Sequence, residues 1–281
     1  MIKKAYQQLN VVYEIVKKVT LISDSPRAGN LRTLQLEKIV EKVVLHVRSI
    51  LLLIDGNRGC FEELDVALIA SATRNIMDSV NLYFHIAERG LSEDQKQLRF
   101  LTLYINGQRN SQSIANKFGF SNDCERIAIE KFSFNRVLEE VEALPAFMSL
   151  TSDEQAQVLS GCKAAFRLRS PGILDLNTES AVFNLLSNST HGLFVGLGNN
   201  SINSSCLFVG FFEVIRLITI SLLVARLYTA RMVKDYLDLR KKLYRLLNVE
   251  EKQLLKKYCS PNDLDTYLQQ LHVEYESPIF K

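Results

Sequence analysis

The segment from Leu207 to Ala230 constrains the fold most strongly, because it is apolar on almost every side of a helix. Such a helix is either buried in a protein core or crosses a membrane. Three charged residues interrupt the segment, namely Glu213, Arg216 and Arg226, and a charge at bilayer depth is costly. We therefore expect a buried helix at the centre of the fold. It is predicted to run from Cys206 to about Leu247, with a break in it left open.

Helical periodicity also dominates the rest of the chain. Only 12 Gly and 5 Pro occur in 281 residues, which argues against an all-β protein rich in tight turns. The sequence predicts an all-α helical bundle, one domain over residues 1–281, with an N-terminal helix in 1–30, a core bundle in 31–230 and a basic helical extension in 231–281. Apolar spacing predicts helices at about Leu31–Ile54, Leu64–Arg89 and Asn262–His272.

Charge and cysteine usage limit the function classes. A formal net charge of +3 is too small to imply nucleic-acid binding by itself. The 5 cysteines are scattered and form no CxxC pair, which is typical of reduced thiols in the cytoplasm. No two of the 4 histidines stand at metal-ligand spacing. We expect a cytoplasmic protein with no metal, no cofactor and no membrane partner, and a homodimer is left open.

The segment Asn177–Gly192 gathers the most reactive side chains and reads as one helix, with Asn177 or Thr178 expected to cap its first turn. Three of these side chains share a stripe at i, i+3 and i+7: Asn184, Ser187 and His191. A Ser-His pair on one helix, without a GxSxG elbow, is weak support for a hydrolase. The alternative is a structural His191 that caps the helix end.

A second polar stripe runs along the predicted helix Leu64–Arg89. Its members recur at helical spacing: Arg74, Asp78, Asn81 and His85. The stripe is either the solvated side of an amphipathic helix, or it places Arg74 and Asp78 as an orienting pair inside a pocket. We predict a shared polar pocket for Arg74, Asp78, Ser187 and His191.

Charged residues in the last third of the chain supply the remaining candidates for binding. Glu213 and Arg216 stand at i, i+3 in the apolar helix, where buried charges are expected to pair. The segment Arg231–Lys257 holds nine basic and four acidic residues. It is a candidate surface for RNA, DNA or an acidic partner, with Arg240, Lys241 and Lys242 as its most concentrated charges, or else a solvated helix face.

Two segments carry a resemblance to a known family. HVRSILLLIDG followed by DVALIASATRNIMDSVNLYFHI has an Arg-x-x-x-acid helix, and FNLLSNSTHG has an aromatic-x-x-Leu-Ser-x-x-x-His helix. From about residue 40 to 230 the chain resembles a family of bacterial all-helical proteins of unknown function, found partly in mobile and defence-associated gene neighbourhoods. The acid here is Asp78 and the aromatic is Phe183, where that family is expected to have Glu and Tyr.

That family is similar in pattern to the HEPN (higher eukaryote and prokaryote nucleotide-binding) superfamily, which includes metal-independent RNases. In those enzymes an arginine separated from a histidine by four to six intervening residues stabilises phosphate charge, while the histidine acts as acid and base on the RNA. This chain departs from the pattern, since the positions before His191 are Asn184, Leu185 and Leu186. Arg74 or Arg216 would have to supply the arginine.

The resemblance implies a bacterial defence or toxin-like protein that acts on RNA or a nucleotide, with His191 as the acid-base group and Arg74 as the phosphate ligand. The alternative is a non-catalytic helical sensor or protein-binding module, in which the same polar residues form a structural network. Whether the protein is an enzyme is left open by the sequence.

Overall fold

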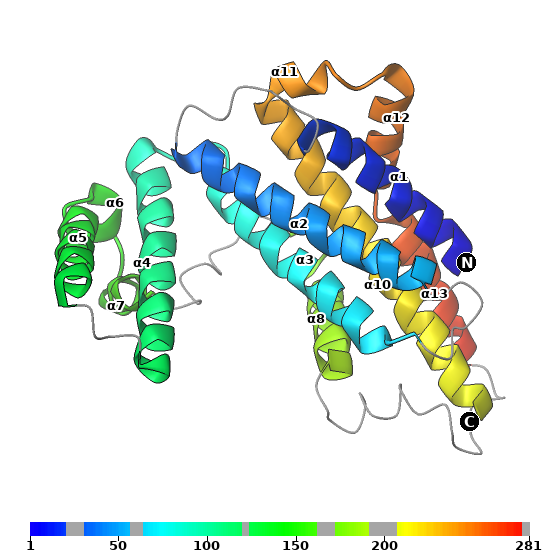
Figure 1. The fold of residues 1–281 in the computed structure, drawn as a ribbon. Helices are drawn as coiled ribbons and strands as arrows, with labels where there is room; N and C mark the ends of the chain where they lie inside the picture. Colours follow the sequence, from blue (N-terminus) through cyan, green and yellow to red (C-terminus); the bar gives the residue numbers. More distant parts are fainter. Residues whose placement is uncertain (21–30, 57–63, 120–123, 162–171, 191–206, 277–281) are drawn as a thin grey trace. The chain divides into compact units, whose positions relative to one another are not determined.

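The computed structural model describes residues 1–20, 31–56, 64–119, 124–161, 172–190 and 207–276, with the backbone alone at 31, 124–132, 207–213 and 274–276. Every regular element in these ranges is a helix (Figure 1), so the protein is all-α. The helices are α1 (Ile2–Thr20), α2 (Leu31–Gly56), α3 (Val66–Ala87), α4 (Glu93–Phe118), α5 (Cys124–Glu142), α6 (Pro145–Met148), α7 (Ser152–Ser160), α8 (Leu176–Thr190), α10 (Leu207–Leu239), α11 (Lys241–Tyr244), α12 (Val249–Tyr258) and α13 (Asn262–Glu276).

The chain divides into two compact units. The first comprises Met1–Tyr83 with Gly172–Lys281, and the second is Phe84–Pro171. Helix α3 passes from one unit into the other. The expectation of one domain over the whole chain stays a prediction.

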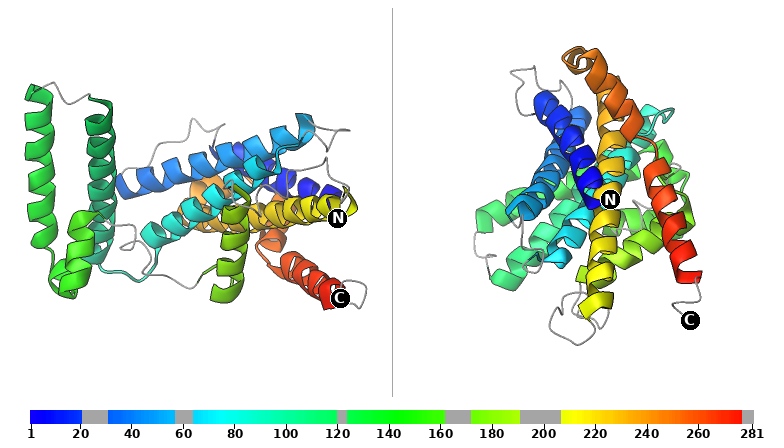
Figure 2. Two further views of the ribbon diagram at one scale, coloured as in Figure 1. Left: turned by 90° about the horizontal axis from the view of Figure 1, so that it is seen from below. Right: turned by 90° about the vertical axis from the view of Figure 1, so that its right-hand side faces the viewer.

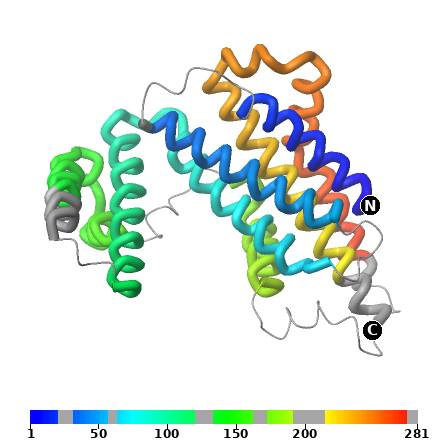
Figure 3. Tube along the Cα trace, viewed as in Figure 1, coloured from blue at the N-terminus to red at the C-terminus, as the bar shows by residue number. Residues whose placement is uncertain are grey.

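In the first unit, several helices pack against α10, which is 33 residues long. Every residue from 217 to 230 of α10 is buried, and α1, α2, α11, α12 and α13 all contact this helix. Figures 2 and 3 show α1 alongside α10, and this packing buries the stripe of α1 that includes Leu9, Val12 and Val16. No helix in the described ranges is long and apolar enough to cross a membrane.

The predicted long helix is interrupted at one residue. Helix α10 ends at Leu239, and Arg240 has φ −111° and ψ 64°, outside the helical region, before α11 begins. After this break, the side chains of Leu243 and Leu247 are both buried. The break that the sequence left open between Cys206 and Leu247 therefore lies at Arg240, after which the chain turns and buries these two leucines.

The second unit is a small helical cluster in which α4 contacts α5, α6 and α7. Its core is formed by Leu98, Leu101, Ile105, Val141, Ala146, Phe147 and Val158. At the end of α7, Gly161 has φ +66° and approaches α4 so closely that an added Cβ would lie 2.9 Å from Asn106 Cα. Asn106 Nδ2 also donates a hydrogen bond to the Gly161 carbonyl at 2.5 Å. A glycine is therefore required where α7 closes on α4.

Candidate functional site

Helix α8, which carries two of the residues predicted for the site, is capped by Asp175. Its Oδ1 accepts hydrogen bonds from the backbone N–H groups of Asn177 at 3.1 Å and Thr178 at 3.0 Å. Hydrogen bonds from the Thr178 side chain and backbone hold the pKa of Asp175 below its usual value. The prediction of Asn177 or Thr178 as the cap is wrong, because the helix begins at Leu176 and the residue before it supplies the carboxylate.

Helices α3 and α8 meet at two contacts within the first unit. Asn81 Nδ2 donates a hydrogen bond to Glu179 Oε1 at 2.8 Å. Two turns earlier on α3, the Arg74 guanidinium lies 4.9 Å from the centre of the Phe183 ring. Since the later residue of α3 meets the earlier residue of α8, the two helices run antiparallel at this contact. Arg74 and Asn81 of the polar stripe thus contact the helix that carries Ser187.

Glu179 is a buried acid that the sequence places only as a favourable charge in the first turn of α8. It is 4% exposed. Its carboxylate lies against Gly172, where an added Cβ would be 2.7 Å from Glu179 Oε2. A side chain at residue 172 would therefore collide with the carboxylate unless one of the two moved. Burial of the carboxylate makes its hydrogen bond to Asn81 important, because an unpaired buried acid is costly.

Arg74 is half-buried, and its Nε is buried without a hydrogen-bond partner in the described part of the chain. The contact with Phe183 holds its planar guanidinium over an aromatic face, an arrangement that suits arginine better than lysine. A guanidinium oriented in this way suits recognition of an anion such as phosphate or carboxylate.

The other residues predicted for this site are less closely gathered. Ser187 is half-buried on α8, while Asn184 of α8 and Asp78 of α3 are exposed. Arg216 is half-buried on α10. His191 and the side chain of Glu213 lie outside the described residues. The shared pocket for Arg74, Asp78, Ser187 and His191 stays a prediction.

Of the basic residues predicted as a binding surface, Arg240 is occupied within the fold. Its Nη1 lies 2.6 Å from Glu37 Oε1 on α2, and the same oxygen accepts a hydrogen bond from the Tyr236 hydroxyl at 3.2 Å. Burial, followed by the charge of Glu37, raises the pKa of Tyr236. Lys241 and Lys242, in contrast, are exposed on α11. Arg240 is therefore a structural residue, and the two lysines are free to face a partner.

Arg226, which in the sequence served only to disfavour a membrane span, carries the most buried charge in the described part of the chain. Arg226 of α10 is 0% exposed. Its Nη1 donates to Asp263 Oδ2 of α13 at 2.6 Å and to Gln8 Oε1 of α1 at 2.9 Å. Its guanidinium also lies 5.6 Å from the centre of the Tyr258 ring. One arginine thus joins α1, α10, α12 and α13, and we read this cluster as structural.

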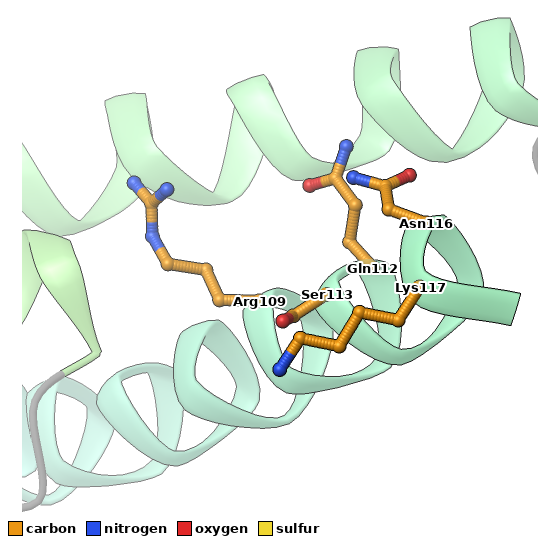
Figure 4. Close-up of a pocket in the computed structure, with 5 residues that line it drawn as sticks. All are labelled: Arg109, Gln112, Ser113, Asn116 and Lys117. Atoms are coloured by element: carbon orange, nitrogen blue, oxygen red, sulfur yellow. The ribbon is translucent and has the colours of Figure 1, made fainter.

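The second unit has a shallow groove along the exposed half of α4 (Figure 4). It has a volume of about 360 Å³ and is lined by Arg109, Gln112, Ser113, Asn116 and Lys117. Arg109 is already engaged, since its Nε and Nη2 donate to the Leu159 carbonyl at 3.1 and 3.0 Å. Because the groove is open and lined by exposed polar side chains, we do not place the functional site here.

Comparisons of the chain with protein-family models, with curated proteins and with solved structures found no match. Function is therefore inferred from the contact between α3 and α8.

Proposed function

We propose that this protein is a bacterial defence or toxin-like protein of the cytoplasm that acts on RNA or a nucleotide, with Arg74 as the ligand of a phosphate group. The observation that carries the proposal is the setting of Arg74. Its guanidinium is held against Phe183 at 4.9 Å, and its buried Nε has no hydrogen-bond partner in the described part of the chain. An arginine oriented in this way is suited to phosphate recognition.

The antiparallel contact of α3 and α8 supports a role for residues at the end of α8. Ser187 lies one turn beyond Phe183 on α8, and His191 follows four residues later in the sequence. In the proposed reaction His191 takes the proton of an RNA 2′-hydroxyl, the O2′–P bond forms, and the P–O5′ bond then breaks as the protonated His191 gives its proton to O5′. Arg74 stabilises the charge that develops on the phosphate oxygens. This reaction requires no metal.

The test is cleavage of mixed single-stranded and structured RNA by the full-length protein in the presence of a metal chelator. The variants are His191→Ala and Arg74→Gln, with Arg48→Gln as the matched control, because Arg48 is an exposed arginine of α2. We expect cleavage by the wild type and by Arg48→Gln, and a loss of about a hundredfold or more in the other two, the usual scale for an acid-base or charge-stabilising group. Full activity of a folded His191→Ala protein would refute the proposed chemistry.

One observation favours a second candidate, a non-catalytic sensor or partner-binding module. The contacts Asn81–Glu179 and Arg74–Phe183 join two helices, as members of a structural network would. In that case His191→Ala should lower the free energy of unfolding by about 1–3 kcal/mol, the cost of unpairing a buried polar group. Loss of stability without any RNA cleavage by the wild type would favour this second function.

A further inference from the structure

The turn between α10 and α12 presents a surface that the proposed function does not use. We call residues 239–249 the basic corner. Leu243 and Leu247 are 3% and 2% exposed, four residues apart, so they fix one side of the corner to the core. The residues between and around them consequently point outward. Figure 1 shows α11 at one end of α10, with the chain continuing from it into α12.

Positive charge is concentrated in the basic corner, which is flanked by the exposed acids Asp238 and Glu250. Lys241, Lys242 and Arg245 are exposed, and no acidic residue occurs between 239 and 249. Neighbouring cations are engaged in the fold. Arg231 Nε donates to the Cys259 carbonyl at 2.6 Å, and Lys234 pairs with an acid one turn away on α10 at 3.1 Å. Within the basic corner, the exposed positive charge is therefore that of Lys241, Lys242 and Arg245.

Apolar side chains are exposed among these charges. Val249 is 70% exposed, Leu246 48% and Leu239 44%. Single exposed apolar residues are ordinary on a protein surface, but three within eleven residues, interspersed with three cations, form a mixed basic and apolar patch. Such a patch is suited to the interface of an anionic membrane, where cations meet headgroups and apolar side chains enter the acyl boundary.

We propose that the basic corner binds the surface of membranes that contain anionic phospholipid. Nucleic acid fits the patch less well, because it would leave the aliphatic side chains without a partner. The aromatic residue of the corner, Tyr244, already has the Lys252 ammonium 4.8 Å from its ring centre, which restricts stacking on a base. The expectation of no membrane partner rested on the absence of a spanning segment, and binding at the surface requires none.

The experiment is co-sedimentation of the full-length protein with phosphatidylcholine vesicles, with and without phosphatidylserine, at low and at physiological salt. Binding is expected only with phosphatidylserine and should weaken as salt is added. In Lys241→Gln/Lys242→Gln the partition coefficient should fall roughly thirtyfold, about fivefold for each lysine. Leu246→Ser/Val249→Ser should also reduce binding, by about tenfold, through lost apolar contact with the lipid.

The matched control is Lys256→Gln/Lys257→Gln, which removes the same charge from two exposed lysines of α12 outside the corner. If the control loses as much binding as the corner variant, the attraction is general and the proposal is refuted. It is also refuted if no vesicle is bound, or if single-stranded RNA binds to the corner lysines while phosphatidylserine vesicles do not. None of these outcomes depends on Arg74 or His191, so the test is independent of the proposed function.

Discussion

Replacing Asp263 by alanine tests whether the buried arginine organises the first unit. The change removes the carboxylate that lies 2.6 Å from Arg226 Nη1, while Arg226 itself stays 0% exposed. Gln8 Oε1 remains at 2.9 Å as an uncharged acceptor. A buried guanidinium would then lack its counter-charge.

The structure sets the size of the effect. Removing one partner of a buried ion pair costs about 3–5 kcal/mol. Asp263 is 34% exposed at its side chain, and Gln8 still accepts a hydrogen bond from Arg226, so we expect the low end of that range. The free energy of unfolding should fall by about 3 kcal/mol.

Urea unfolding followed by circular dichroism measures this change, with hydrogen exchange of α1, α10 and α13 to assign it to the first unit. Asp265→Ala is the matched control, because Asp265 is an exposed acid in the same first turn of α13. Lys4→Met removes the other cation near Asp263, 69% exposed and 3.3 Å away. Both controls should cost less than about 1 kcal/mol. An Asp263→Ala loss no larger than that of Asp265→Ala would refute the argument.

Three further predictions concern stability. Burial raises the pKa of Asp263, but the hydrogen bond and charge of Arg226 outweigh burial and hold this pKa below 3.8. The carboxylate therefore stabilises the protein above that pH, and its contribution is lost as pH falls through the lowered pKa. Acid unfolding of Asp263→Ala should accordingly show a weaker pH dependence than that of the wild type below about pH 4. Gly161→Ala should destabilise the second unit by about 1–3 kcal/mol more than Gly119→Ala, since both glycines have positive φ but only Gly161 meets the backbone of α4; equal thermal shifts would contradict this. Glu37→Ala should cost about 1–3 kcal/mol in urea unfolding by removing the carboxylate that binds Arg240, and a loss under about 0.5 kcal/mol would show that their 2.6 Å contact is not stabilising.

Helix positions could be predicted because helical periodicity is a local property of the sequence. The second helix begins at Leu31 and the last at Asn262, as the apolar spacing indicates. The end of α10 could not be predicted in the same way. Arg240 leaves the helix where its side chain pairs with Glu37, a residue 203 positions away, and no local pattern encodes such a partner.

The candidate site was predictable residue by residue, but its contacts were not. Helical spacing selected Arg74 and Asn81 on one helix, and the family resemblance selected Phe183 on another. The packing of α3 against α8 places Arg74 over Phe183 and brings Asn81 to Glu179. The same packing buries Glu179, which a capping argument alone places at the solvated end of a helix.

The partners of Arg226 follow from the burial of its charge. If a charged residue within an apolar helix is buried, it must find a counter-charge or acceptors, because an isolated buried guanidinium is not tolerated. Glu213 and Arg216 were expected to pair on this ground, whereas no partner was predicted for Arg226, whose partners lie 218 and 37 residues away at Gln8 and Asp263. The same requirement binds α13 to α10, so the residues predicted as a C-terminal extension supply the charge that the most buried part of the first unit needs.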